Sequence, residues 1–299
     1  MSNKSLILRL VISLLVLSIL YQKLDFNSVL ATIRTANLWY LLLSFLMICL
    51  NYIISGFRWR SLIFFSSSFN GRGVFKLIKL YFIGAFFNNF MPTSIGGDVY
   101  KAYVLGKNTN DMPKATGATF ANRLSGLVIL ALLSTISLVV LLGFWGILIF
   151  IAFWILCILG FVSLDLFSRL IPKLKPFNDA IHLYRFHKDS IVKSLFFSLL
   201  VQIVANLAHF FATRSVGISI TLPQAFFVFP IIGFLSFLPL SFNGIGIQDF
   251  FYGKFLLFWG ISPVLSATSS LLYHATRVSV SLIGGFLLLV SNDKSKETS

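Results

Sequence analysis

Continuous apolar runs of about twenty residues recur along this chain, and they limit its fold more than any other feature of the sequence. The runs lie at about 6–22, 38–56, 74–91, 116–142, 144–163, 191–213, 223–240 and 264–290, and a shorter one follows at about 250–261. A helix needs roughly 20 mostly apolar residues to cross a bilayer. Charged residues make up only 11% of the chain, too few to cover a soluble surface, since soluble domains carry about 25%. The runs therefore predict an all-α integral membrane protein.

Two of these runs are interrupted by residues that do not suit a simple spanning helix. The run at 74–91 carries two lysines and is followed by a proline, while the run at 223–240 is broken by Pro230 and Pro239. Irregular backbone at membrane depth is tolerated only where it is buried in protein or lines a wet cavity. We therefore predict two re-entrant hairpins, at 74–107 and 223–261, and six spanning helices formed by the other long runs.

The distribution of positive charge agrees with this arrangement. If the N-terminus is cytoplasmic and the hairpins do not cross, eighteen of the 24 Lys and Arg residues lie in cytoplasmic segments, Arg58 and Lys101 among them. Four lie outside, and the remaining two, Arg123 and Arg277, lie inside spans. Because cytoplasmic loops carry such an excess, we expect a multi-pass protein of the cytoplasmic membrane with both termini inside. The sequence has no soluble basic face of the kind that binds nucleic acid, so we expect no nucleic-acid partner.

The two interrupted runs also resemble each other. Residues 90–97 (FMPTSIGG) align with residues 237–244 (FLPLSFNG), an acid follows each segment, and an arginine lies in the next span. The aligned prolines are half a chain apart (239 − 92 = 147). Each half has three crossings, so the second half is inverted relative to the first, as in many transporters. We predict one transmembrane domain, 1–299, built as an inverted repeat with half one at about 5–142, half two at about 144–290 and a polar tail at 291–299.

Both motifs concentrate polar residues where the chain is expected to be inside the membrane. Their glycines allow close backbone approach, and a helix that restarts after them presents free N–H groups, which are suited to phosphate. The acid in each motif either caps that helix or takes part in the site. The candidate substrate-binding residues are Asn88, Asn89, Pro92, Ser94, Gly96, Gly97, Asp98 and Lys101 in the first motif, Ser241, Asn243, Gly244, Gly246 and Asp249 in the second, and Arg123, His274 and Arg277 in the spans.

The two arginines inside spans have two interpretations that are compatible. A guanidinium in a bilayer is costly unless it is paired or hydrated, so Arg123 and Arg277 are expected to form ion pairs with Asp98 or Asp249. The alternative role is to hold a lipid phosphate, for which the bidentate geometry of arginine is suited. An ion pair can open to admit a phosphate. His274 lies three residues before Arg277 and shares its helix face.

Sequence motifs for enzymatic chemistry are missing. The chain has no HExxH, no Cys/His cluster, no GxxxxGK[ST] and no GxSxG, so we expect no enzyme activity, no catalytic residue, no metal and no cofactor. The predicted function is translocation of an anionic phospholipid or lipid-linked headgroup across the membrane, through a polar cavity between the hairpins. The alternatives are an ion- or proton-coupled transporter of a small soluble solute, a membrane-embedded transferase, and a non-transporting membrane subunit.

The segments PTSIGGD at 92–98 and LPLSFNGIGIQD at 238–249, with the arginine of the last span, resemble the lysylphosphatidylglycerol synthase transmembrane-region family. The resemblance extends over about residues 5–290. In synthases of this family the membrane region moves aminoacylated phosphatidylglycerol between leaflets, and a separate soluble domain performs the aminoacyl transfer. The sequence ends in SNDKSKETS after Val290, so we expect no soluble domain and carry no synthetase activity over.

The same resemblance implies a flippase-like protein whose partners are membrane lipids, and the basic residues predict that these lipids are anionic. The resemblance leaves open whether the protein also binds a second copy of the chain or a separate lipid-modifying enzyme. Where many relatives have glutamate, this chain has Asp249. Aspartate has the same charge as glutamate but a shorter side chain, so the role of Asp249 stays open.

Overall fold

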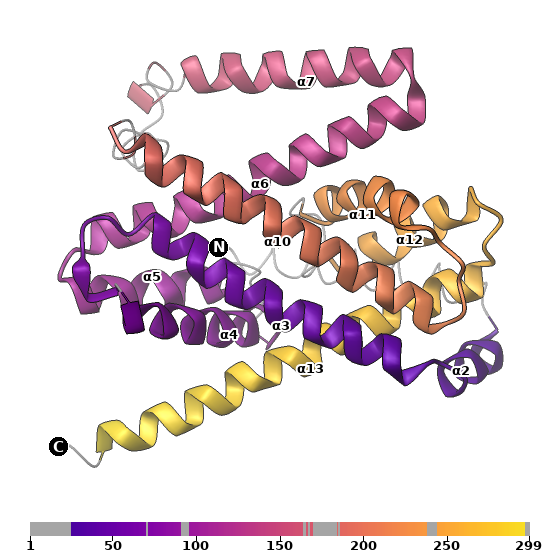
Figure 1. The fold of residues 1–299 in the computed structure, drawn as a ribbon, viewed down its shortest axis with the longest axis horizontal. Coiled ribbons are helices and arrows are strands. Elements are labelled where there is room, and N and C mark those ends of the chain that lie inside the picture. Colours follow the sequence, from indigo (N-terminus) through magenta and orange to yellow (C-terminus); the bar gives the residue numbers. More distant parts are fainter. Residues whose placement is uncertain are drawn as a thin grey trace.

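The computed structural model describes residues 25–69, 71–90, 96–163, 166, 168–169, 184, 186–237 and 244–296. The regular structure of these residues is entirely helical (Figure 1), which confirms the predicted all-α class. The longer helices are α2 (Phe26–Arg34), α3 (Leu38–Ser61), α4 (Val74–Phe90), α5 (Gly96–Thr109), α6 (Met112–Leu142), α7 (Phe144–Val162), α10 (Lys188–Ser215), α11 (Leu222–Phe237), α12 (Ile247–Leu257) and α13 (Pro263–Lys296), and two 3-10 turns, η1 (Ser67–Phe69) and η2 (Gly71–Gly73), precede α4.

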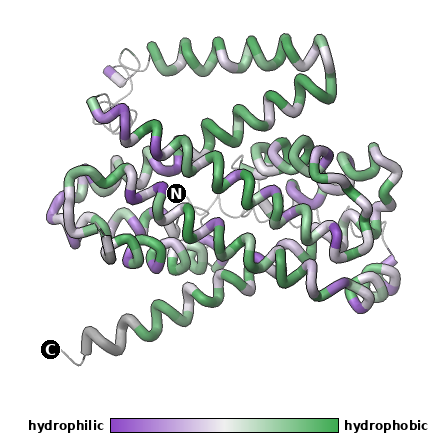
Figure 2. Tube along the Cα trace, viewed as in Figure 1, coloured by the Kyte–Doolittle hydropathy of each residue, from purple (hydrophilic) through white to green (hydrophobic). Residues whose placement is uncertain are grey.

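Five of these helices are long and apolar enough to cross a membrane: α3, α6, α7, α10 and the Pro263–Val290 part of α13. They coincide with five of the six runs predicted to span, and the sixth run, at 6–22, lies outside the described residues. The surface of α7 is hydrophobic along most of its length (Figure 2), and side chains such as Leu156 and Phe161 are exposed. An apolar surface of this kind suits lipid contact, and the chain is a multi-pass membrane protein.

The centre of the molecule is formed by α3 and α10, which lie side by side (Figure 1) and make the most extensive helix–helix contact. The Ser44 hydroxyl donates to the Ala208 carbonyl oxygen at 2.9 Å, and the Asn51 amide donates to the Val201 carbonyl oxygen at 2.9 Å. The later residue of α3 therefore contacts the earlier residue of α10. The two helices are therefore antiparallel, so that their C-terminal ends lie at opposite ends of the bundle.

Each of the two interrupted runs forms a pair of packed helices, α4 with α5 and α11 with α12. The segments that join them, 91–95 and 238–243, lie outside the described residues. In the first pair Gly84 and Gly97 are in close contact, because a Cβ atom on Gly97 would overlap the Gly84 carbonyl oxygen. Small residues permit such close packing between membrane helices. The pairs also pack across the molecule, since α4 lies against α13 and α11 lies against α6.

The connection between α5 and α6 is fixed by Asp111, the N-cap of α6. Its carboxylate accepts a hydrogen bond from the Lys114 backbone N–H at 3.0 Å and lies 2.7 Å from the Lys114 ammonium. The hydrogen bonds from the Lys114 side chain and backbone hold the pKa of Asp111 below its usual value. This cap starts α6 one turn before the apolar part of the helix, so that Arg123 lies well inside α6 and faces α5.

Candidate functional site

The acid of the first motif is the centre of an ion-pair cluster. Asp98 lies in the first turn of α5, and its Oδ1 atom is 2.8 Å from the Lys101 ammonium, one turn further along. Its Oδ2 atom accepts from the Arg123 guanidinium of α6 at 2.6 Å. Both carboxylate oxygens therefore have a cationic partner, and Arg123 forms one of the two ion pairs that the sequence allowed. The Arg123 guanidinium also lies 4.9 Å from the Phe237 ring of α11, so it contacts both helical pairs.

Lys101 is buried, with 5% of its surface exposed. Lysine is almost never buried unless it is paired, and here Asp98 supplies the negative charge. The ammonium also lies 4.0 Å from the centre of the Tyr81 ring and 5.6 Å from that of Trp59. Such contacts stabilise a cation through the electron-rich ring faces. The structure therefore places Lys101 among α3, α4 and α5.

Arg58 is a buried cation that sequence reasoning did not include among the candidate site residues. It is 8% exposed and belongs to α3, which continues past the predicted end at residue 56. Its Nε atom donates to the Asn122 side-chain oxygen at 2.9 Å, and one terminal nitrogen donates to the Tyr81 hydroxyl at 3.2 Å. Asn122 also donates to the Tyr81 hydroxyl. No glycine or proline follows Arg58 to end the helix there, a signal that could have extended the predicted span and brought Arg58 into it.

The acid of the second motif begins a different chain of contacts. Asp249 is 2% exposed, and its Oδ2 atom accepts from the Gly246 N–H at 2.9 Å, which caps α12. Its Oδ1 atom lies 3.4 Å from His274 Nε2, without the alignment of a hydrogen bond. His274 Nδ1 is 3.2 Å from an Arg277 terminal nitrogen; since arginine can only donate, this imidazole nitrogen accepts. The shared face of His274 and Arg277 thus links Asp249 to Arg277.

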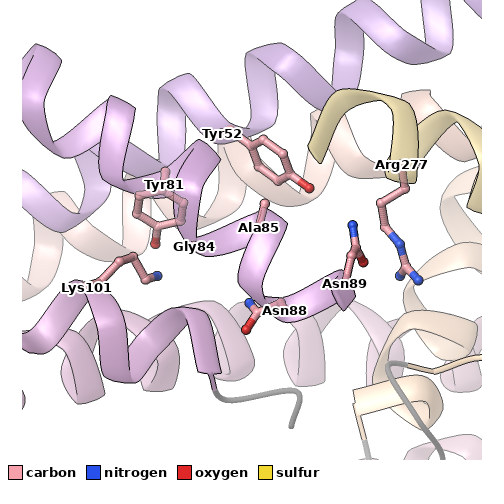
Figure 3. A pocket seen from close by; sticks show the side chains of 8 residues that line it. All are labelled: Tyr52, Tyr81, Gly84, Ala85, Asn88, Asn89, Lys101 and Arg277. Atoms are coloured by element: carbon pink, nitrogen blue, oxygen red, sulfur yellow. The ribbon is translucent and has the colours of Figure 1, made fainter. Parts of the chain in front are cut away.

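A cavity of about 150 Å³ lies beside the last turns of α4 (Figure 3). Lys101 stands at one end of it and Arg277 at the other, with Asn88 and Asn89 between them. The Asn88 side-chain oxygen accepts from the Gly97 N–H at 2.8 Å, which fixes the orientation of this amide. The cavity is lined by Tyr52, Tyr81, Gly84, Ala85, Asn88, Asn89, Lys101 and Arg277.

The relationship of the chain to known proteins agrees with this architecture. The sequence pattern of the lysylphosphatidylglycerol synthase TM region matches residues 6–285. The chain belongs to this family. The resemblance read from the two motifs is thereby confirmed, and the family region contains both helical pairs and every residue that lines the cavity. A search of curated proteins finds no match to the chain.

Within this lysylphosphatidylglycerol synthase TM region, the structure gathers some of the predicted site residues and separates others. Asn88, Asn89, Lys101 and Arg277 meet at the cavity. A second group lies next to it through direct contacts, and comprises Gly97, Asp98, Arg123 and His274. Gly244, Gly246 and Asp249 lie further back, at the start of α12, and Gly96 begins α5. Pro92, Ser94, Ser241 and Asn243 lie outside the described residues.

The backbone conformation of two glycines explains how the family region positions the acid of the second motif. Gly244 and Gly246 have φ values of 83° and 87°, in the left-handed region that glycine adopts without strain, so α12 can begin sharply with Asp249 in its first turn.

The described residues contain no group of three or more His, Cys, Asp and Glu side chains placed to hold a metal ion. The donors around the cavity are instead cations, amides and hydroxyls, which are suited to an oxyanion.

Proposed function

We propose that this protein translocates an anionic, phosphate-bearing lipid across the cytoplasmic membrane, with the headgroup passing through the cavity that residues of α3, α4, α5 and α13 line. It then acts as a transporter and not as an enzyme, and its partners are membrane lipids. The observation that carries this proposal is the charge of the cavity wall. Lys101 and Arg277 line the cavity, and none of the residues that line it is acidic.

Two positively charged side chains at a cavity among apolar helices are unfavourable unless they are paired or hydrated. Charged side chains at membrane depth are expensive, and they usually mark the path of an ion or substrate. Lys101 and Arg277 line the cavity, where an anion can approach both of them. An anionic headgroup is attracted to both side chains, whereas a cationic one is repelled by them.

The contacts of the two halves support an inverted repeat. Asp98 pairs with Arg123 of α6, and Asp249 lies beside His274 of α13. The two aspartates are 151 positions apart along the chain, and so are their two partners, since 249 − 98 and 274 − 123 are each 151. The sequence alignment had placed Arg277 opposite Arg123, whereas these contacts place His274 there.

A further pair of contacts follows the same offset of 151 positions. Arg58 contacts Asn122, and their counterparts His209 and Tyr273 stack with ring centres 3.7 Å apart. The packing of α4 against α13 and of α11 against α6 repeats the relationship at the level of helices. These correspondences support six spans, two re-entrant hairpins and an N-in, C-in topology, in which the site lies where the repeats meet.

The two halves differ at one position that bears on function. The counterpart of Lys101 is Tyr252 (252 − 101 = 151), which is fully buried and hydrogen-bonded to His209. The hairpin of the first half therefore has a cation at the cavity, whereas the corresponding residue of the second half is a neutral tyrosine that does not line it. The anion site belongs mainly to the first hairpin and to Arg277 of the last span.

The test is transbilayer exchange by the purified protein in liposomes. Fluorescent phosphatidylglycerol, lysylphosphatidylglycerol, phosphatidylethanolamine and an isoprenoid phosphate are supplied in turn. We expect exchange of at least one anionic lipid, and a loss of about tenfold or more in Arg277→Gln, since a hydrogen bond to a charged group contributes roughly 1.5–3 kcal/mol. Lys107→Gln is the matched control, because Lys107 is exposed on α5. Folded protein that exchanges none of these lipids would contradict the proposal.

A further inference from the structure

We infer that translocation of the anionic headgroup is coupled to a proton that binds to His274, so that the headgroup and the proton cross the membrane together. This coupling rests on the proposed function and adds its driving force. Three features of the molecule support it: the contact of His274 with a side chain of the cavity, the carboxylate on the other side of its ring, and the burial of the two groups.

His274 lies on α13, between the cavity and the start of α12. Its Nδ1 atom is 3.2 Å from a terminal nitrogen of Arg277, which lines the cavity, and its Nε2 atom is 3.4 Å from Asp249 Oδ1. His274 and Asp249 are buried, with 9% and 2% of their surfaces exposed. The imidazole thus joins a side chain of the cavity to a buried carboxylate, and histidine is the side chain that gains or loses a proton most readily near neutral pH.

The contact with Arg277 determines where a further proton can bind. Arginine has no acceptor atom, so the Nδ1 lone pair accepts from Arg277, and the single ring hydrogen of the neutral imidazole is on Nε2, facing Asp249. The ring can take a second proton only at Nδ1. That proton must replace the hydrogen bond from Arg277, because two donors cannot share the position. Protonation of His274 and the His274–Arg277 hydrogen bond therefore exclude each other, whatever other contacts Arg277 makes.

An anion in the cavity shifts this competition toward the proton. Its oxygens are acceptors for the Arg277 guanidinium, which suits bidentate binding of phosphate and turns away from His274 to bind it. The negative charge of the anion also attracts a proton to the neighbouring ring. The imidazolium that forms has Asp249 as its counter-ion, since the Nε2 atom already faces Oδ1. Binding of the anion and binding of the proton therefore favour each other, and such a coupling is reciprocal.

The charges and protons of the transport cycle balance. On the acidic side of the membrane, a singly charged headgroup and one proton bind together and add no net charge to the site. On the alkaline side the headgroup leaves, Arg277 returns to Nδ1, and the proton is released from the same nitrogen. One proton then moves with each headgroup in the same direction. A pH difference across the membrane can therefore drive the lipid toward the alkaline side.

The titratable and charged groups around His274 come from several helices. They are Cys49 and Tyr52 of α3, His209 of α10, Asp249 and Tyr252 of α12, and Tyr273 and Arg277 of α13 itself. His209 has the same chemistry as His274, but its Nδ1 atom is bonded to the Tyr252 hydroxyl and its ring stacks on Tyr273. His209 thus has a neutral partner where His274 has a carboxylate, so Asp249 favours the proton on His274.

The other two helices that pack against α13 are α2 and α4. Their titratable groups are Asp25 and Arg34 at the ends of α2, and Lys76, Lys79 and Tyr81 on α4. Both ends of α2 are exposed. The two lysines lie in the first two turns of α4, whereas Asn89, which lines the cavity with Arg277, lies in its last turn (Figure 3). Tyr81 lies beside Lys101 at the other end of the cavity. The charges that act directly on His274 are therefore those of Asp249 and Arg277.

The decisive experiment imposes a pH difference on proteoliposomes that contain fluorescent phosphatidylglycerol. Potassium and valinomycin hold the membrane potential at zero, and quenching from outside reports the share of labelled lipid in each leaflet. With about one pH unit across the membrane, we expect the lipid to accumulate up to about tenfold in the leaflet on the alkaline side, because one proton accompanies each lipid and a tenfold ratio corresponds to about 1.4 kcal/mol. A protonophore should abolish the accumulation, and protein-free liposomes give the background.

His274→Gln and His209→Gln form a matched pair of variants. Glutamine can accept from Arg277 but cannot bind a proton, so His274→Gln should bring the leaflet ratio under the same pH difference close to one. His209→Gln removes the other buried imidazole and should keep the accumulation. A second measurement uses the wild-type protein alone: addition of short-chain phosphatidylglycerol in weakly buffered detergent should take up to about one proton per protein from the solution, as reciprocal coupling requires.

Each other outcome overturns a defined part. Lipid exchange that does not respond to the pH difference, or accumulation on the acidic side, overturns the coupling and leaves lipid translocation intact. Lipid binding without proton uptake also overturns the coupling. Accumulation and proton uptake that persist in folded His274→Gln overturn His274 as the proton site. The absence of any lipid exchange contradicts the proposed function, and the coupling that rests on it is overturned as well.

Discussion

At the scale of single residues, buried charges in this protein are balanced by very few partners. Asp98 holds both Lys101 and Arg123, while Arg58 has the neutral partners Asn122 and Tyr81. A buried ion pair contributes little net stability, but removing one member leaves the other charge uncompensated. We therefore expect that Asp98 acts by keeping these two cations in place.

This role predicts a specific pattern in a double-mutant cycle. Asp98→Asn leaves the Lys101 ammonium buried without its carboxylate, and should destabilise the protein by about 3–5 kcal/mol. Removing that ammonium as well, in Asp98→Asn with Lys101→Met, should recover part of the loss, because the uncompensated charge is gone. The stabilities are measured by unfolding in detergent, and we expect a coupling energy of about 1–3 kcal/mol. Additive effects of the two substitutions would mean that the pair does not interact.

The sequence could predict some residues of the site and not others, for a physical reason. Asn88, Asn89 and Lys101 are polar residues within or beside an apolar run, and such residues are costly there unless they serve a purpose. Tyr81 lies in the same run, but a tyrosine among apolar residues is indistinguishable from an ordinary packing residue. Its contacts with Lys101 and Arg58 depend on three helices meeting, and a single sequence carries no such information.

At the scale of elements, the first helical pair depends on the contact between two glycines. A Cβ atom on Gly97 would overlap the carbonyl oxygen of Gly84, and the Gly97 N–H holds the Asn88 side chain at the cavity. Because that carbonyl is part of the backbone, it cannot move aside as a flexible side chain can. The separation of α4 from α5 is therefore set by the absence of a side chain at position 97.

Gly97→Ala should push α5 away from α4, destabilise the protein by about 1–3 kcal/mol through overpacking, and reduce lipid exchange. Gly253→Ala is the matched control in α12, because nothing lies within 4 Å of a Cβ added there. Alanine is preferred over glycine in a helix by about 0.5–1 kcal/mol, so the control should be neutral or stabilising. The two variants are compared by thermal unfolding and by exchange rate. If both behave alike, the close contact does not determine the geometry of the pair.

The elements themselves could be predicted well, because length and hydropathy decide them. The runs at 38–56, 116–142, 144–163, 191–213 and 264–290 correspond to helices long enough to span, and the prolines and glycines mark the two interrupted pairs. The packing partners could not be predicted in this way. An apolar helix surface is compatible with lipid or with any other apolar helix, so the contacts of α4 with α13 and of α11 with α6 required three-dimensional information.

At the scale of the whole molecule, the orientation of the two halves follows from the central pair of helices. The hydrogen bonds of Ser44 and Asn51 make α3 and α10 antiparallel. Both are long enough to cross the membrane, so the segments that follow them should emerge on opposite sides. On the positive-inside rule we expect the segment after α3 on the cytoplasmic side. The segment after α10 is then expected on the outside.

Cysteine labelling in intact cells tests this orientation. Ser67 and Ser219 are exposed in the segments after α3 and α10, and each is replaced by cysteine in a background in which Cys49 and Cys157 are alanine. A membrane-impermeant maleimide should label Ser219→Cys in intact cells, and should label Ser67→Cys only after the membrane is opened. Labelling of both positions from outside would contradict the antiparallel crossing of α3 and α10. The reverse pattern would keep that crossing and invert the whole protein.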